Sequence, residues 1–162
     1  MTDAPPPASP QSPDLVSAVA PIADDKAAAF GTRKNPYIWG TGRRKWAVAR
    51  VRVRPGPGKF LVNNRDVGEF FRLEKDRKAV SQPLQVTEAT ASFDVLVTVH
   101  GGGVSGQAGA VVLGLARALV KVNPDFEPKL REHRLLTRDA RKVERKKYGQ
   151  SGARRRFQFS KR

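Results

Sequence analysis

The sequence predicts an α+β fold in which helices pack on one face of a small sheet. Residues 46–54 and 92–99 alternate between apolar and polar side chains, which is the period of half-buried strands. A glycine-rich loop then leads into residues 108–122, whose apolar side chains recur at the spacing of one helical face. Early strands followed by a strand, a tight loop and a helix are typical of α+β domains.

The first half of the folded region is expected to contain a β-hairpin. The region begins at Tyr37. Its first strand turns Ala47, Ala49, Val51 and Val53 toward the core and Val48, Arg50, Arg52 and Arg54 away from it. Residues 55–58, Pro-Gly-Pro-Gly, predict a turn, and residues 59–62 predict a returning strand that pairs with the first.

Three helices are expected besides the long one. Asp66 is placed to cap a short helix through residues 67–71. A second short helix over residues 75–80 should end at Gln82, because Pro83 disfavours helical geometry in the residue before it. The long helix ends at Asn123-Pro124, and a shorter amphipathic helix spans residues 126–133.

The chain is strongly basic, and its charge is unevenly distributed. The formal net charge is +16, yet residues 1–40 hold three basic and four acidic residues while residues 41–162 hold 28 basic and 11 acidic ones. This balance favours nucleic acid as the partner, ahead of acidic membrane surfaces. We expect a disordered Pro- and Ala-rich leader (1–36), a globular RNA-binding domain (37–137) and an extended basic C-terminal tail (138–162).

Several classes of function lack the residues they need. The chain has no cysteine, which excludes thiol nucleophiles and thiolate metal sites, and its two histidines are isolated. No apolar run approaches the roughly 20 residues that span a bilayer, and the N-terminus lacks the pattern of a secretory signal. We expect a cytoplasmic, non-enzymatic protein with no catalytic residue, metal, cofactor, small-molecule substrate or membrane association.

The loop over residues 101–106 is the strongest signal for an enzyme. Gly101, Gly103 and Gly106 match G-x-G-x-x-G between a strand and a helix, so a nucleotide phosphate at the helix N-terminus is one alternative. Against it, no second strand presents an acid to a ribose, and the P-loop lysine is absent. Ser105 near His100 also lacks the G-x-S-x-G context of a nucleophile. A tight turn is the simpler interpretation, with RNA phosphate at the loop amides left open.

Three basic clusters are candidates for RNA contact. Arg43, Arg44 and Lys45 have no acid beside them, and the flanking glycines would let their backbone approach phosphates. The alternating arginines of residues 50–54 fit either a solvated sheet face or an RNA-facing one. From Arg138 onward the tail carries eleven basic and two acidic residues, with aromatic side chains able to stack on bases. A histone-like DNA-binding protein is the rival to an RNA-binding one.

Four segments resemble the family of the ninth protein of the bacterial small ribosomal subunit. They are GTGRRKWAVARVRVRPGPGKFLVN, GGGVSGQAGA, LLTRDARKVERKKYG and FQFSKR, and the resemblance covers about residues 37–162. It implies a mixed four-stranded sheet with a left-handed β-α-β crossover, as in the second domain of ribosomal protein S5. It also implies a structural constituent of the small subunit that binds ribosomal RNA in the head, beside other head proteins, and reaches the peptidyl-site tRNA with its tail.

The resemblance assigns roles to individual residues. The implied tRNA-binding residues are Ser160, Lys161 and Arg162, and the implied rRNA-binding residues are Arg43, Arg44, Lys45, Arg138, Arg141, Arg145, Lys146, Lys147, Tyr148, Arg154, Arg155 and Arg156. The chain departs from the family pattern at Phe157, where a proline is usual, and at Gln150-Ser151-Gly152, which replaces a more basic stretch. The leader has no counterpart in the usual short form. Fully extended, the fourteen residues from Gly149 to Arg162 reach at most roughly 45–50 Å.

Overall fold

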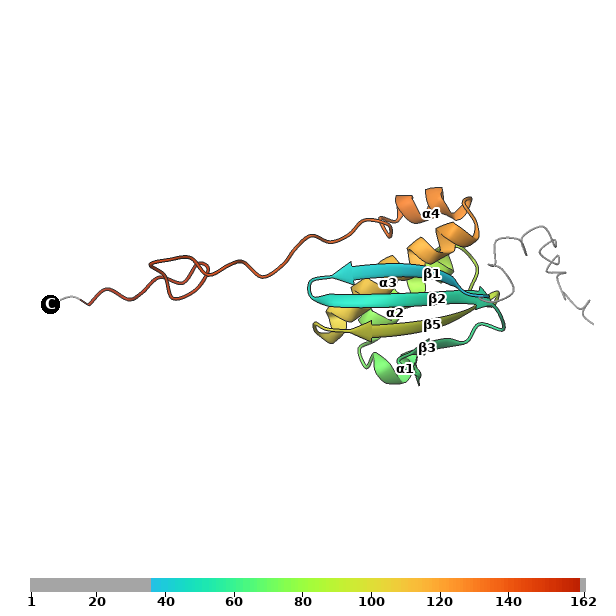
Figure 1. Cartoon of the computed structure of the whole chain (residues 1–162), viewed down its shortest axis with the longest axis horizontal. Coiled ribbons are helices and arrows are strands. Elements are labelled where there is room, and N and C mark those ends of the chain that lie inside the picture. The colour runs from blue at the N-terminus through green and yellow to red at the C-terminus, as the bar shows by residue number, and fades with distance from the viewer. Residues whose placement is uncertain (1–35, 161–162) are drawn as a thin grey trace, which may run out of the picture.

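The computed structural model describes residues 36–160, and these form one five-stranded sheet with helices on one of its faces. The strand order is β1-β2-β5-β3-β4. Figure 1 shows α2 and α3 behind the sheet and the C-terminal segment leading away from the domain. The elements are β1 Ile38–Arg44, β2 Ala47–Pro55, β3 Phe60–Val62, β4 Arg65–Asp66, α1 Val67–Phe70, α2 Glu74–Val86, β5 Phe93–His100, α3 Val104–Val122 and α4 Phe126–Glu132.

The core lies between the sheet and the helix layer, as the alternation in the sequence predicts. Every second residue of β2 and β5 is buried, and the cross-strand pair Val51 and Val97 lies at its centre. The helix α3 buries one face, and two of its three leucines, Leu115 and Leu119, are completely buried. The α+β class and the long helix are therefore confirmed. Asp66 caps α1 as expected, its carboxylate accepting from the Gly68 amide at 3.1 Å.

The predicted hairpin is wrong, because β5 lies between β2 and β3. β2 pairs antiparallel with β5, and β3 pairs parallel with β5. The turn after β2 instead crosses the start of β5, where buried Asp94 accepts from the Gly58 and Lys59 amides at 3.2 and 2.9 Å. The real hairpin joins β1 to β2 through Lys45-Trp46, with Lys45 in the left-handed region at φ 53°. The sheet has five strands rather than four, the fifth being the two-residue β4.

Two further expectations for the fold concern a β-α-β crossover and the end of α2. The parallel neighbours β3 and β5 are joined through α1 and α2, which makes a β-α-β crossover, and its left hand stays a prediction. The helix α2 does not end at Gln82 but continues through Pro83 to Val86. Pro83 and Leu84 are buried, so their packing outweighs the hydrogen bond that proline cannot donate. Thr87 closes the helix by donating to the Pro83 carbonyl at 2.9 Å.

The strand β1 lies directly on α3 through glycine. A Cβ added to Gly42 would lie 1.9 Å from the Ala110 carbonyl oxygen, and one added to Gly40 would lie 2.1 Å from that of Gly114. Both glycines are buried. Only a residue without a side chain permits such an approach of two backbones. The expectation that these glycines open the chain to phosphates is therefore wrong, because they face the helix.

This contact predicts a strong asymmetry between two identical substitutions. Gly42→Ser should destabilise the fold by at least the roughly 1–3 kcal/mol of an overpacked core, since backbone cannot yield as a side chain can. Gly103→Ser should be neutral or slightly stabilising, because a Cβ there meets nothing within 4 Å and serine is a good N-cap for α3. Urea unfolding of both variants measures the difference, and equal midpoints would contradict the close-packing argument.

Candidate nucleic-acid interface

At the tip of the β1–β2 hairpin, the three side chains of the predicted basic cluster point in different directions. Strand alternation leaves Arg43 exposed on the face of the sheet away from the helices and turns Arg44 toward α3. Lys45 occupies the turn and is exposed. The three cations that adjoin in sequence therefore do not form one patch.

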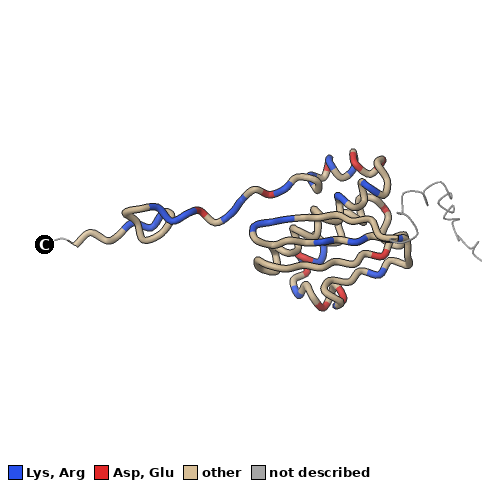
Figure 2. The backbone as a smooth tube through the Cα atoms, in the orientation of Figure 1, with Lys and Arg blue, Asp and Glu red and all other residues tan. Residues whose placement is uncertain are grey.

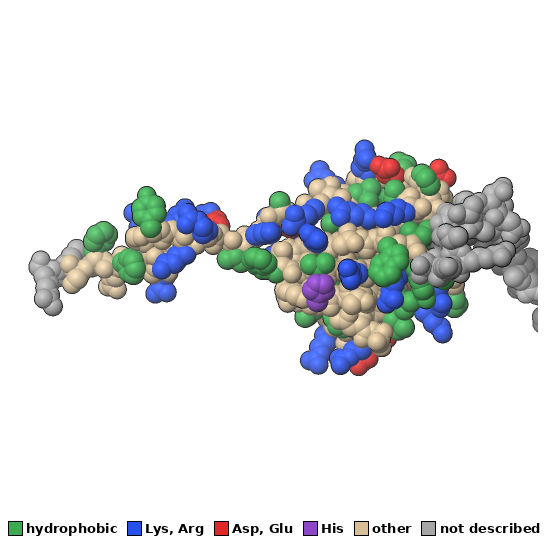
Figure 3. All heavy atoms as spheres, viewed as in Figure 1, with side chains coloured by type: hydrophobic (Ala, Val, Ile, Leu, Met, Phe, Trp, Pro, Cys, Tyr) green, Lys and Arg blue, Asp and Glu red, His purple; other side chains and the backbone are tan. Residues whose placement is uncertain are grey.

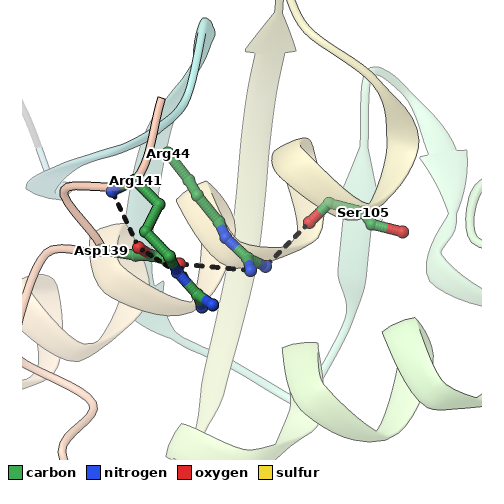
Figure 4. Close-up of polar contacts among 4 residues, drawn as sticks. All are labelled: Arg44, Ser105, Asp139 and Arg141. Atoms are coloured by element: carbon green, nitrogen blue, oxygen red, sulfur yellow. Dashed lines mark hydrogen bonds and ion pairs between the residues drawn. The ribbon is translucent and has the colours of Figure 1, made fainter. Parts of the chain in front are cut away.

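Arg44 joins three segments that are distant in sequence. Its Nη1 donates to the Ser105 carbonyl at 3.3 Å, and its Nη2 lies 3.3 Å from an Asp139 carboxylate oxygen (Figure 4). Its aliphatic part lies on Gly109, where a Cβ would come within 2.3 Å of Arg44 Cδ. Its Nε is buried without a hydrogen-bond partner. Arg44 thus holds the hairpin, the start of α3 and the start of the C-terminal segment together.

Asp139 fixes the root of the C-terminal segment. It accepts from Arg141 Nε at 3.0 Å and Nη2 at 2.9 Å, and from the Arg141 amide at 3.0 Å. The bonds from Arg141 and the charge of Arg44 hold the pKa of Asp139 well below its usual range. Lys142 Nζ lies 5.4 Å from the centroid of the Trp46 ring, a cation–π contact to the hairpin tip. A concavity of about 290 Å³ lies here, lined by Arg44, Lys45, Asp139, Arg141, Lys142 and Val143.

The C-terminal segment closes a loop on itself further along. Arg154 donates to both Glu144 oxygens, from Nη2 at 2.6 Å and from Nε at 3.0 Å, and this lowers the pKa of Glu144. The Ser151 and Gly152 amides donate to the Arg155 carbonyl at 3.0 and 3.3 Å. Figure 1 shows this loop within an otherwise drawn-out segment. The fully extended reach from Gly149 is therefore not attained.

Both acidic residues of the segment 138–160, Asp139 and Glu144, form ion pairs with arginine. The predicted rRNA-binding residues therefore fall into two groups, those that pair with these carboxylates and those that do not. Arg44, Arg141 and Arg154 pair with these carboxylates. Figure 2 shows basic residues from the root of the segment to its loop, and Tyr148 is 96% exposed. Ser160 is exposed, whereas Lys161 and Arg162 lie outside the described residues, as does the predicted leader up to residue 35. Among the predicted rRNA-binding cations, those without an ion pair to any described residue are Arg43, Lys45, Arg138, Arg145, Lys146, Lys147, Arg155 and Arg156.

The glycine loop before α3 is a structural turn. Gly101 and Gly102 adopt left-handed φ values of 73° and 63°, and a Cβ on Gly101 would lie 2.6 Å from the Trp46 carbonyl oxygen. Ser105 donates its hydroxyl to the buried Asp76 carboxylate at 3.2 Å. A carboxylate beside this helix N-terminus would repel a phosphate bound there. The geometry favours the tight-turn interpretation over a nucleotide site.

Sequence reasoning missed the residues that hold the cations in place. In the sequence, Asp139 and Glu144 only interrupt a run of basic residues, and the alternation places Trp46 in a strand. The alternation of residues 38–44 was the available signal for β1, since it places Trp39, Thr41 and Arg43 on the open face. Within residues 36–160 no group of three acidic or histidine side chains could hold a metal ion. In the same span no helix has the length and apolarity to cross a bilayer.

Comparison with known families agrees with these features. A family model described as "Ribosomal protein S9/S16" matches residues 42–162, which is most of the chain and includes the hairpin tip, the whole domain and the basic C-terminal segment. Members of such a family are RNA-binding components of the translation machinery, located in the cytoplasm as part of the ribosome. The chain belongs to the ribosomal protein S9/S16 family and is a structural, rRNA-binding protein of the ribosome.

Proposed function

We propose that this protein is a non-enzymatic constituent of the small ribosomal subunit that binds ribosomal RNA in the head and touches the peptidyl-site tRNA with its C-terminus. The observation that carries the proposal is the unpaired positive charge of the C-terminal segment. Residues 138–160 contain no helix or strand and no side chain that joins the core, so a packing role does not explain them. A polyanion that neutralises the segment does.

The proposed rRNA contacts follow from which cations are unpaired. Arg43, Lys45, Arg138, Arg145, Lys146 and Lys147 are available to phosphates, together with Arg155 and Arg156. The paired residues Arg44, Arg141 and Arg154 would instead shape the segment. Tyr148 offers an exposed ring on which a base could stack. RNA binding of this kind would stabilise folded ribosomal RNA by charge neutralisation.

The proposal keeps three parts of the chain distinct: leader (1–36), domain (37–137) and tail (138–162). The domain would rest on rRNA beside other head proteins, and the tail would carry Ser160, Lys161 and Arg162 to the tRNA phosphates. A left hand for the crossover from β3 to β5 belongs to the same proposal, because it rests on the family resemblance.

The first test is the salt dependence of rRNA binding. The affinity of the full chain for deproteinised small-subunit rRNA should fall steeply with salt, with a log–log slope of roughly 0.7–0.9 per phosphate neutralised. Arg155→Gln with Arg156→Gln should make that slope shallower by about two phosphate contacts. The matched control is Lys78→Gln with Arg131→Gln, two cations already paired with acids on helices, and its slope should not change. A salt-independent affinity would contradict the proposal.

The second test addresses the tRNA contact. A chain lacking residues 160–162 should still assemble into small subunits, because the root and loop of the segment are intact. Its subunits should bind peptidyl-site tRNA about ten-fold more weakly, the factor that about 1.4 kcal/mol represents. Filter binding of tRNA to purified subunits measures this. Unchanged tRNA affinity would remove the tRNA role while leaving the rRNA role standing.

A further inference from the structure

The open face of the sheet is a cationic surface that the proposed tail contacts do not use. Helices cover only one side of β1, β2 and β5, so alternate residues of these strands face solvent (Figures 1 and 3). The strand register sets them in rows, with Trp39 beside Arg52 and Leu96, and Thr41 beside Arg50 and Thr98. Antiparallel sheets commonly leave one face in contact with solvent, so exposure alone does not indicate a binding surface. The side chains on this face are the evidence for one.

Trp39 is an exposed aromatic ring on a rigid element. It is 48% exposed, although its strand is fixed on α3 by the glycine contact and Lys121 Nζ donates to its carbonyl at 2.9 Å. The Arg52 guanidinium carbon lies 5.5 Å from the Trp39 ring centroid and 5.9 Å from that of Tyr37. Arg52 therefore orients the indole while leaving half of it to solvent. A preordered flat ring of this kind is what base stacking requires.

The face also carries positive charge without a counterion. Asp94 is the one acidic residue in β1, β2 and β5, and it is 3% exposed and bound by Arg54 and two backbone amides. Arg50 lies between two threonines and has no ion pair with any described residue. Arg43 is on the same face, at the end nearest the hairpin tip. Exposed arginines beside hydroxyl groups complement phosphate oxygens.

We propose that this face is a second RNA-binding surface, on which a single-stranded segment of ribosomal RNA stacks an unpaired base on Trp39 and sets its phosphates against Arg50 and Arg43. The inference rests on the proposed rRNA partner and adds a surface separate from the tail. RNA fits better than protein because the face combines one accessible ring with unpaired cations rather than a contiguous apolar patch. It also adjoins Lys45, so it continues the cationic hairpin tip.

Tryptophan fluorescence tests the stacking directly. Trp39 and Trp46 are the two tryptophans of the chain, so Trp46→Phe leaves Trp39 as the sole reporter. Titration with deproteinised small-subunit rRNA should quench it. Trp39→Leu should weaken binding by between about five-fold and one-hundred-fold, the range for loss of one stacked base, and Trp39→Phe should retain most of the affinity. Urea unfolding of each variant checks that the fold is retained.

Arg50 has a matched control on the helix layer. Arg50→Gln should make the salt dependence shallower by about one phosphate contact, whereas Arg77→Gln, which removes an exposed cation from α2, should not. Suppose that rRNA binding depends on Arg155 and Arg156 as proposed, but that rRNA does not quench Trp39 and that Arg50→Gln and Arg77→Gln have the same salt dependence. The open face is then not an RNA-binding surface. If the full chain does not bind rRNA at all, the proposed function itself fails. A Trp39 response seen only in assembled subunits, and absent with rRNA alone, would assign the face to a protein neighbour and overturn the proposal.

Discussion

The arrangement of every proposed RNA contact depends on the approach of β1 to α3. Because Gly40 and Gly42 carry no side chain, the backbones of strand and helix meet directly. Arg117 and Lys121 of α3 then reach over the edge of the sheet and donate to the Thr41 and Trp39 carbonyls, each at 2.9 Å. These contacts cover acceptors on an edge strand that would otherwise be open to pairing with another chain. They also fix the position of the hairpin tip, and with it the starting point of the C-terminal segment.

Three acidic residues in this basic chain, Asp94, Asp139 and Glu144, act as internal counterions for arginine. Asp94 holds Arg54 and the turn after β2, Asp139 holds Arg141 and Arg44, and Glu144 holds Arg154. Backbone donors, chiefly the Lys59 amide, lower the pKa of Asp94, and arginine lowers that of the other two. Since folding lowers these pKa values, the pairs stabilise the fold above the unfolded carboxyl pKa of about 4. That contribution is lost as the pH falls through the folded values.

Local patterns predicted the parts of this fold that depend on neighbours in sequence. The alternation of residues 46–54 and 92–99 and the helical spacing of residues 108–122 correspond to β2, β5 and α3. Pairing of β3 with β5 could not be read in the same way, because it depends on a partner more than 30 residues away. Pro83 stays inside α2 because of tertiary burial that the sequence does not display. Charge density likewise indicates a polyanion partner but cannot tell paired arginines from free ones.

Arg44 shows why that distinction matters for function. Its guanidinium bonds in two directions at once, to the Ser105 carbonyl and to Asp139, while its stem lies on Gly109. A lysine in this position would present a single point charge and could not span both partners. In the proposed function Arg44 would contribute through the direction that it gives to the C-terminal segment, and the neighbouring Arg43 and Lys45 would contact phosphates. Since the same hairpin tip also borders the open sheet face, one fixed point orients the tail and the sheet surface relative to each other, and under the proposals above both would contact a single folded RNA.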